Sequence, residues 1–331
     1  MKIRVISDLH LDVNDRFPFS LRGVEKDVFA LVAGDVSGNV KLTARWIRDN
    51  IHSGMFIAGN HDPAYNDLKK TIGQQKKFLA KTYGLDNNVT FLDESVGVMS
   101  KIIPGTNILV VGSTLYTDYK YMSDYDKDWL EKANKRALEN PKDDLEILTP
   151  EKINMNRGHR GLNDFRWGHV EDEKDKRGLS QRWLSPEDYK TWFDNTFAKI
   201  TEIVEANKDK EIIVMTHHCP TPKCISQQYV ESTLNASYVS DLDDFILKHP
   251  NIKAWCCGHV HTVTNTKVGN TLIVCNPRGY ERNMESLDWN PNTFIDTDIW
   301  EVVKEEYSNA KLEAAREKWH DDFKSIAAFF I

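Results

Sequence analysis

Residues 1–10 of the chain are MKIRVISDLH, and the rest of the sequence is organised around this stretch. Lys2 to Ser7 alternates in polarity and is rich in β-branched residues, a pattern that predicts a strand. Asp8 and His10 follow directly, where the buried strand gives way to a loop. A carboxylate and an imidazole two residues apart can turn toward one point and bind a metal ion. The alternative is an aspartate that caps a turn beside a surface histidine.

Composition restricts the class of protein. The 331 residues suit one large domain or two small ones, with ample apolar core. The formal net charge of −7 gives no general attraction to duplex DNA or to an anionic membrane, although it is compatible with a local basic patch. No apolar run of about 18 residues is present, so we expect no membrane span. The N-terminus enters a strand without a hydrophobic leader, so we expect no signal peptide and a cytoplasmic location.

The chain has five cysteines, and four of them lie near polar motifs: Cys219, Cys224, Cys256 and Cys257. Without an export signal, reduced thiols in a cytosol are the expected state. Zinc binding by Cys219 and Cys224 is the rival interpretation. Their spacing is not CxxC, however, and a proline lies between them.

The first part of the chain repeats a unit of strand, polar site and helix. Val28–Ala33 is a continuous apolar run, as in a strand buried on both faces, and it ends at Gly34-Asp35. Met55–Ala58 is a similar run that ends at Gly59-Asn60-His61-Asp62. Helical periodicity follows each run, over Lys41–Ile51 and over Asn66–Tyr83. This order predicts an α/β layer whose sites lie at the carboxyl ends of the strands.

Three short strands without intervening helices come next, over Val89–Leu92, Val96–Ile103 and Asn107–Leu115. They predict an antiparallel section and a second sheet packed on the first. From about residue 116 to 185 the sequence is polar and charged, with a helix predicted over Asp124–Glu139. We interpret this stretch as an insertion of helices and loops over one face of a single domain that spans residues 1–331.

The last part of the chain returns to strands that end in polar residues. Ser185-Pro186 predicts the start of a helix that runs to about Asn207. Glu211–Met215 is a strand that precedes His217, and Ile252–Cys257 is a strand that precedes Gly258-His259-Val260-His261. The other predicted elements are a helix at Ser240–Lys248, strands at Thr271–Cys275 and Asp298–Val303, and a C-terminal helix at about 305–331.

Polar clusters therefore follow five apolar strands. They are Asp8 with His10, Asp35, Asn60 with His61, His217, and His259 with His261. Any one of them alone is more often a turn residue or a buried core histidine than a metal ligand. Strand ends of an open sheet lie along one edge, so five clusters in this order predict side chains that meet around metal.

These motifs resemble the calcineurin-like metallophosphoesterase superfamily, whose pattern is D-x-H, G-D, G-N-H-[DE], H and G-H-x-H in that order. The match spans residues 8 to 261. The resemblance implies an α/β (α+β) fold, a four-layer β-sandwich of two mixed sheets flanked by helices. It also implies a site at one edge of that sandwich.

The resemblance further implies a ligand set. Asp8, His10 and His261 would bind one metal ion, Asn60, His217 and His259 would bind a second, and Asp35 would bridge the two. Two divalent ions about 3.5–4 Å apart can hold a bridging hydroxide for in-line attack on a phosphoryl group. Carboxylate, imidazole and amide ligands suit Mn²⁺, Fe, Ni²⁺ or Zn²⁺, and affinity order alone does not choose among them.

His61 is the expected catalytic residue, because the resemblance implies that it faces the substrate and protonates the leaving group. Its alternative role is a structural hydrogen bond to Asp8 or Asp35. Asp62 is expected to orient a neighbouring group. The candidate substrate-binding residues are His218, Arg278 and Arg166. Their alternative roles are packing beneath the site for the histidine and ordinary surface positions for the arginines.

Some stretches depart from the family pattern. Val36-Ser37-Gly38-Asn39, after the G-D motif, is smaller and more polar than the acid or aromatic residue of many members. Ser/Thr protein phosphatases carry G-D-x-H-G and G-D-x-V-D-R-G and lack a terminal G-H-x-H, so that class is disfavoured. The stretches most similar to uncharacterised bacterial and phage members are Gly112–Asp118, Asn163–Arg166 and Asn276–Tyr280. The polar, basic and aromatic stretch Asn154–Trp167 is either a lid over the metals or a solvated loop.

The sequence therefore predicts a metal-dependent phosphoric ester hydrolase. The first hypothesis is a phosphodiesterase that acts on a phosphorylated small molecule or a nucleotide. The alternatives are a nuclease or nucleic-acid end-processing phosphatase, and a non-catalytic scaffold that keeps the fold. No membrane partner is expected, a nucleic-acid partner stays open, and the sequence does not indicate the oligomeric state.

Overall fold

The structure is a computed structural model that describes residues 1–14, 28–64, 71–83, 88–140, 146–172, 180–283, 285 and 288–305. The helix predicted at about 305–331 lies outside these residues, apart from Glu305. None of the helices in the described ranges combines the length and the apolar character needed to cross a bilayer.

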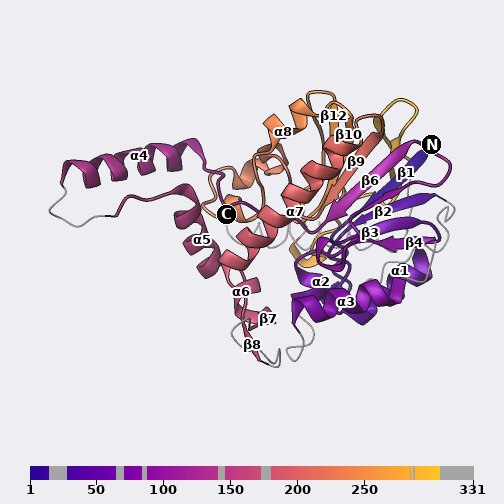
Figure 1. The fold of residues 1–331 in the computed structure, drawn as a ribbon, viewed down its shortest axis with the longest axis horizontal. Helices are drawn as coiled ribbons and strands as arrows, with labels where there is room; N and C mark the ends of the chain where they lie inside the picture. The colour runs from indigo at the N-terminus through magenta and orange to yellow at the C-terminus, as the bar shows by residue number, and fades with distance from the viewer. Residues whose placement is uncertain are drawn as a thin grey trace, which may run out of the picture.

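Two six-stranded mixed sheets form the centre of the molecule (Figure 1). In the first sheet four neighbouring strands are parallel, and a two-stranded antiparallel section is added at one edge. Its order is β14 (Glu301–Lys304), β13 (Thr293–Asp296), β1 (Lys2–Ile6), β2 (Phe29–Ala33), β3 (Gly54–Ile57) and β4 (Val89–Phe91).

The second sheet has four parallel inner strands and an antiparallel strand at each edge. Its order is β11 (Thr264–Val268), β12 (Thr271–Cys275), β10 (Ile252–Cys257), β9 (Glu211–Thr216), β6 (Ile108–Ser113) and β5 (Ser100–Ile102). The prediction of a second sheet is confirmed. The prediction that Val89–Leu92 joins an antiparallel section is wrong, because β4 pairs in parallel with β3 in the first sheet.

Alternation along each inner strand separates three apolar layers. In β2, Leu31 and Ala33 face the other sheet, whereas Ala30 and Val32 face the helices on the outer side. In β10, Ala254 faces the other sheet and Trp255 faces outward. Both faces of these strands are therefore buried, which explains their continuous apolar runs in the sequence.

Helices cover the outer face of each sheet (Figure 1). The first sheet packs against α1 (Val40–Asn50) and α3 (Ile72–Tyr83), and the second packs against α7 (Pro186–Ala206) and α8 (Asp243–Lys248). The expected four-layer sandwich of two mixed sheets flanked by helices is confirmed.

Local signals account for several helix boundaries. The Asn39 side chain accepts hydrogen bonds from the backbone amides at the start of α1, and Ser185 with Asp188 forms a capping box at the start of α7. The helix predicted to begin at Asn66 begins at Ile72 in the structure. A separate one-turn helix, α2 (His61–Ala64), precedes it.

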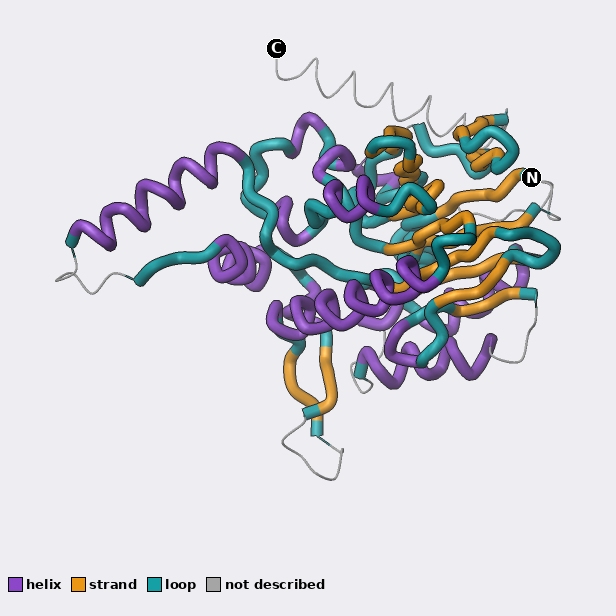
Figure 2. The backbone as a smooth tube through the Cα atoms, turned by 45° about the horizontal axis from the view of Figure 1, so that its top comes forward, coloured by secondary structure: helices purple, strands orange, loops and turns teal. Residues whose placement is uncertain are grey.

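The predicted insertion, residues 116 to 185, contains α4 (Asp124–Glu139), α5 (Pro150–Gly161), α6 (Asp164–Trp167) and the hairpin of β7 (His169–Glu171) and β8 (Gln181–Trp183). Figures 1 and 2 show α4 extending away from the sheets, while α5 and α6 lie closer to them. The described chain also has short 3-10 turns at Glu94–Val96, Pro222–Cys224, Gln227–Tyr229, Asn235–Ser237 and Glu281–Asn283.

Candidate metal centre

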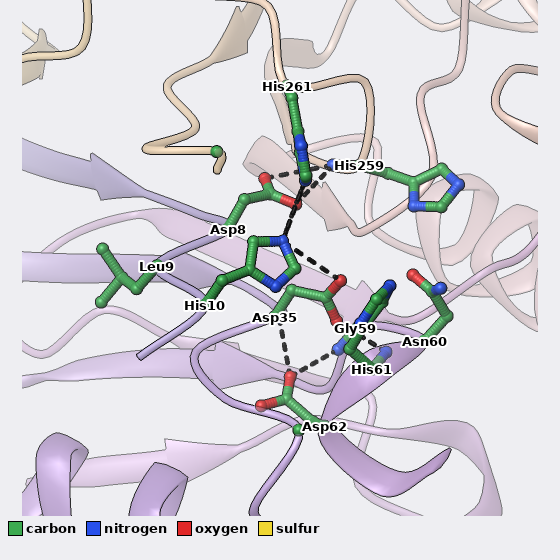
Figure 3. Close-up of polar contacts among 12 residues, drawn as sticks. Asp8, Leu9, His10, Asp35, Gly59, Asn60, His61, Asp62, His259 and His261 are labelled. Carbon is green, nitrogen blue, oxygen red and sulfur yellow. Dashed lines mark hydrogen bonds and ion pairs between the residues drawn. The ribbon is translucent and has the colours of Figure 1, made fainter. Parts of the chain in front are cut away.

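The carboxyl ends of five parallel strands meet at one edge of the sandwich. The ends of β1, β2 and β3 come from the first sheet, and the ends of β9 and β10 come from the second. All seven predicted metal ligands lie there: Asp8, His10, Asp35, Asn60, His217, His259 and His261. Figure 3 shows Asp8, His10, Asp35 and His261 converging, while Leu9 points away from them.

The backbone turns sharply at these strand ends. Asp8, His10, Asp35, His259 and His261 have φ values of 52°, 43°, 53°, 68° and 48°. This left-handed conformation is uncommon outside glycine, and it is tolerated best by aspartate, asparagine and histidine. Such outliers concentrate at functional sites, where the surrounding structure holds them. The D-x-H, G-D and G-H-x-H motifs therefore suit the turns as well as the chemistry.

Two motif glycines let carboxylates approach the backbone closely. A Cβ atom on Gly59 would lie 2.0 Å from Asp35 Oδ1. A Cβ atom on Gly258 would lie 2.5 Å from Asp8 Oδ2. Both distances are far below van der Waals contact, so only glycine leaves room for these carboxylates.

Asp8, His10 and His261 form the first group of candidate ligands. The two Nε2 atoms of His10 and His261 are 2.9 Å apart, and Asp8 Oδ1 lies 3.4 Å from His261 Nε2. Two nitrogen atoms that bind one ion at about 2.1 Å with perpendicular bonds lie about 3 Å apart, so the spacing fits a shared metal. Burial holds the pKa of His10 well below its usual value, which leaves its ring neutral and able to coordinate.

Asp35, Asn60, His217 and His259 form the second group. His217 Nδ1 lies 2.8 Å from the carbonyl oxygen of Ala33, which places the Nδ1 proton there and leaves a lone pair on Nε2. That Nε2 atom lies 2.9 Å from Asn60 Oδ1 and 3.3 Å from Asp35 Oδ2. Three acceptor atoms face one another, so a proton or a metal ion must lie between them.

The electrostatics of the second group lead to the same conclusion. Burial lowers the pKa of His217, but the Asp35 carboxylate outweighs burial and raises it to about 9. Within the described residues, His259 Nε2 and Asp35 Oδ2 are buried and have no hydrogen-bond partner. Buried polar atoms are costly to leave unpaired, so a cation at this point would satisfy both.

Asp35 lies between the two groups. Its Oδ2 atom is 3.9 Å from His10 Nε2 and 3.3 Å from His217 Nε2, while its Oδ1 atom accepts a hydrogen bond from the His61 backbone amide at 2.8 Å. The residues present therefore fit a pair of cations that share Asp35.

Asp62 supports this arrangement from behind. Its Oδ2 atom accepts hydrogen bonds from the backbone amides of Asp35 at 2.7 Å and Gly59 at 2.9 Å (Figure 3). Its Oδ1 atom accepts one from the Thr43 hydroxyl at 2.8 Å. The Val36–Asn39 departure also has a structural role, because the Ser37 hydroxyl and the Gly38 amide bind Asp12.

Three residues that contact the candidate metal ligands are not among the predicted site residues. Glu285 accepts a hydrogen bond from His261 Nδ1, and carboxylates of this kind orient metal-binding imidazoles. The Tyr280 ring packs 4.4 Å from the His10 ring and 4.9 Å from the His261 ring, measured between centroids. Asp164 accepts hydrogen bonds from the Asn60 amide. Tyr280 lies in the marked stretch Asn276–Tyr280, and Asp164 lies in the marked stretches Asn163–Arg166 and Asn154–Trp167, but neither was predicted to contact a metal ligand. Glu285 lies in no marked stretch.

The predicted catalytic histidine lies at the outer side of the centre. His61 begins α2, is partly exposed, and has its ring centroid 5.0 Å from that of His10. His218 is buried and packs its ring 4.1 Å from the His259 ring and 5.4 Å from the Tyr116 ring.

The two predicted arginines make contacts with the protein itself. Arg278 is buried, and its guanidinium binds the Glu281 carboxylate and lies over the Trp289 ring. Arg166 is exposed and contacts Asn163 and the Arg160 carbonyl oxygen.

The cysteine alternative also has a structural answer. Cys219, Cys224 and Cys257 have sulfur atoms within 4.8 Å of one another, and all five cysteines are free. Cys219, Cys224 and Cys257 lie in the apolar layer between the second sheet and its helices. Cys219 Sγ donates a hydrogen bond to the Gly258 carbonyl oxygen at 3.1 Å, a contact that a thiol makes and a zinc thiolate cannot. This contact favours reduced thiols.

A profile of the calcineurin-like phosphoesterase family matches residues 1–263. The chain belongs to this family. Membership confirms the predicted enzyme class, a metal-dependent phosphoric ester hydrolase, and it implies divalent metal ions. No curated protein sequence matches this calcineurin-like phosphoesterase.

Solved structures with a similar fold are distant in sequence. Phosphopantetheinyl hydrolase from Mycobacterium tuberculosis superposes with a TM-score of 0.56 at 14% identity, covering 93% of this chain and 98% of that one. A structure described as that of a 5′-nucleotidase from Staphylococcus aureus gives a TM-score of 0.39 at 12% identity, covering 97% of this chain and 58% of that one. The first similarity supports the metallophosphoesterase sandwich, and the second is too weak for any conclusion.

Proposed function

We propose that this calcineurin-like phosphoesterase is a phosphodiesterase with two divalent metal ions, acting on a small phosphorylated molecule or a nucleotide. The position of Asp35 carries the proposal. Its Oδ2 atom lies between His10 Nε2 and His217 Nε2, at 3.9 and 3.3 Å. A carboxylate oxygen shared by two groups of ligands is the arrangement that a pair of ions requires.

In this proposal Asp8, His10 and His261 hold one ion, and Asn60, His217 and His259 hold the other. Bound divalent ions would activate water as a nucleophile and neutralise charge on the phosphoryl oxygens. Their identity among Mn²⁺, Fe, Ni²⁺ and Zn²⁺ is left to experiment. The protein keeps the ligand atoms in place through Asp62 and Glu285, whose carboxylates bind the Asp35 amide and the His261 ring.

His61 is the proposed general acid. Its backbone amide donates a hydrogen bond to Asp35, and its ring centroid lies 5.0 Å from that of His10, beside the ligand groups. The ring is partly exposed, unlike the buried His10 and His217 rings, so it can reach a leaving group from the solvent side. An imidazole at this position can give its proton to the departing oxygen.

The environment of the centre favours a diester. A phosphomonoester carries up to two negative charges and benefits from additional cations, whereas a diester carries one. The two arginines predicted to bind phosphate are directed at Glu281 and at Asn163. Aromatic rings lie near the ligands instead, Tyr280 beside His10 and Tyr238 beside His259. The fold shared with a protein named as a phosphopantetheinyl hydrolase also supports a small phosphorylated substrate.

The test compares hydrolysis of bis-p-nitrophenyl phosphate and p-nitrophenyl phosphate by metal-stripped protein resupplied with Mn²⁺ or another ion. We expect metal-dependent turnover of the diester at a higher kcat/KM than that of the monoester. Turnover of the monoester alone would overturn the diester assignment. Metal binding without turnover of either compound would favour the scaffold alternative.

A nuclease is the second candidate, and one surface favours it. Trp167 in α6 and Trp183 in β8 are 48% and 57% exposed, and the exposed Arg166 lies on the same short helix as Trp167. Aromatic rings beside an arginine can stack on unpaired bases. Binding of single-stranded DNA or RNA that weakens with salt, and weakens further in Trp167→Ala, would support this candidate. No binding at low salt would remove it.

We also propose a cytoplasmic location, on the basis of the cysteines. All five cysteines are free, including Cys219 and Cys257, whose sulfur atoms are 3.3 Å apart. Thiols this close together persist in a reducing environment, which supports the expected cytoplasmic location.

A further inference from the structure

Asn60 is bound by a residue of the insertion. Its Nδ2 atom donates hydrogen bonds to both carboxylate oxygens of Asp164, at 3.2 and 3.0 Å. Both side chains are buried, at 2% and 3% exposure. Asp164 begins α6, which lies against α2, the helix that follows Asn60 directly. The insertion therefore reaches the inside of the metal centre.

The Asp164 carboxylate is itself held in place. The Tyr189 hydroxyl, from α7, donates a hydrogen bond to Asp164 Oδ2 at 3.1 Å. The Phe165 and Tyr189 rings pack against each other with centroids 5.1 Å apart, which fixes α6 on α7. The acceptor that faces Asn60 thus belongs to a packed part of the protein and not to a free loop.

The orientation of the Asn60 amide decides whether it can bind a metal. An asparagine side chain has a carbonyl oxygen, which can coordinate a cation, and an NH₂ group, which cannot. Rotation by about 180° exchanges the two with little change in shape. An ionised carboxylate only accepts hydrogen bonds, so Asp164 selects the orientation in which NH₂ faces it. Asn60 Oδ1 then points toward His217 Nε2, 2.9 Å away.

We propose that Asp164 is a positioning residue for the second metal ion, which sets the Asn60 amide in its metal-binding orientation. This inference rests on the proposed pair of ions. The insertion is then part of the metal centre. Asp164 acts on the second ion only, and not on the ion that Asp8, His10 and His261 would hold.

A positioning role and a merely structural role of Asp164 predict different effects on the two metal ions. If Asp164 only stabilised the fold, its replacement would lower the stability and would leave both metal affinities unchanged. If it positions Asn60, the affinity for the second ion falls and the affinity for the first is retained. Residues that orient metal ligands typically change affinity by about 10–100-fold.

The experiment titrates metal-stripped Asp164→Asn and wild type with Mn²⁺, by calorimetry and by electron paramagnetic resonance. We expect the first equivalent to bind as in wild type. The second should bind about 10–100-fold more weakly, with loss of the spin-coupled signal of an adjacent Mn²⁺ pair. Two equivalents bound by Asp164→Asn with wild-type affinities would overturn the inference. Wild type that binds fewer than two ions would instead overturn the proposed function.

Asp126→Asn is the matched control. Asp126 is another buried aspartate of the insertion. Its partner is Arg157, at 2.9 Å, and not a candidate metal ligand. The same substitution there should affect stability without changing either Mn²⁺ affinity. A loss of second-ion affinity in Asp126→Asn equal to that of Asp164→Asn would show a general effect of disturbing the insertion and would contradict the inference.

A swap of the two side chains gives a second, independent test. In Asn60→Asp/Asp164→Asn the carboxylate stands at position 60 and the amide at position 164. The carboxylate can bind metal in either orientation and accept a hydrogen bond from the amide behind it. We expect the double variant to recover second-ion affinity relative to Asp164→Asn alone. No recovery would count against orientation as the cause.

If Asp164→Asn does not fold, Tyr189→Phe is the alternative variant, because it removes the hydroxyl bound to Asp164. It should weaken the affinity for the second ion by about 2–10-fold. An unchanged affinity in that variant would overturn the inference.

Discussion

Asp35 Oδ2 lies 3.3 Å from His217 Nε2, although the two residues follow strands of opposite sheets. The same oxygen lies 3.9 Å from His10 Nε2. Asp35 is therefore the residue through which the two groups of candidate ligands meet.

Asp35→Asn should remove the bridge between the ions. The amide carries no charge, and only one of its two end groups can coordinate a metal. Loss of a residue that merely orients a ligand costs about 10–100-fold in affinity or activity, so loss of the bridge should lower diester turnover by at least about 100-fold. Metal content, measured by mass spectrometry, should fall below two ions per chain. Asp209→Asn, at an exposed residue paired with Lys210, is the control and should keep both.

His61→Ala should separate catalysis from metal binding. Loss of a general acid lowers turnover by about 10²–10⁴-fold, and metal content should stay at two ions per chain. The side chain also lies with His10 and Asp35 in a group that could hold metal, so the metal measurement decides between the two roles. His52→Ala, at an exposed residue, should change neither quantity. Biological function retained in His61→Ala would favour a scaffold.

Gly59→Ala should damage the site by crowding alone. The new Cβ atom would lie 2.0 Å from Asp35 Oδ1, and the Gly59 amide is tied to Asp62. Overpacking of this kind costs about 1–3 kcal/mol, which urea unfolding can measure. Gly73→Ala in α3 is the control, since its Cβ would meet only the flexible end of Glu171 at 3.3 Å. Equal stability of the two variants would contradict the argument from close approach.

Lys76→Met should lower the free energy of unfolding by about 3–5 kcal/mol, because it leaves the buried Asp93 carboxylate without its partner at 2.8 Å. Lys132→Met is the control, since its ion pair with Asp128 is exposed and such pairs contribute about 0–1 kcal/mol. If Lys76→Met lowered the free energy of unfolding no more than the control does, the buried pair would contribute no more to stability than an exposed pair.

The pH dependence of this effect has a definite sign. Burial lowers the pKa of Lys76, but the Asp93 carboxylate outweighs burial and the net shift is upward. A raised pKa gives stability that is present below the ordinary lysine pKa of about 10.4 and is lost only as the pH rises above it. The difference between wild type and Lys76→Met should therefore be the same at pH 6 and pH 8.

The sequence predicted the elements that are buried on both faces. The strand predictions Ile252–Cys257 and Thr271–Cys275 have the same bounds as β10 and β12. Continuous apolar runs that end in glycine or a polar motif leave little choice of register. By contrast, β11 has the sequence TNTKV and is a partly exposed edge strand, so no apolar pattern marked it. The polar helix α5 lacks a strong apolar face for the same reason.

Site residues that belong to local motifs were predicted, and those contributed by distant parts of the chain were not. The predicted ligands come from short motifs at strand ends, where sequence position fixes spatial position. Asp164 is 104 residues from Asn60, and Glu285 is 24 residues from His261, and nothing local in the sequence links either pair. Arg278 stays a predicted phosphate-binding residue; Glu281, three residues later, binds its guanidinium, a pairing that a strand-end motif could not reveal.

The ligand groups also belong to both halves of the sandwich. Asp35 and Asn60 follow strands of the first sheet, whereas His217 and His259 follow strands of the second. Bound ions would thus cross-link the two layers at one edge, much as a disulfide ties two segments of a chain. Stripping the metal should speed amide hydrogen exchange at the carboxyl ends of β2 and β9 and leave the distant edge of the sandwich unchanged. The apoprotein would then have its lowest local stability at the metal-binding edge of the sandwich, where the ions must enter.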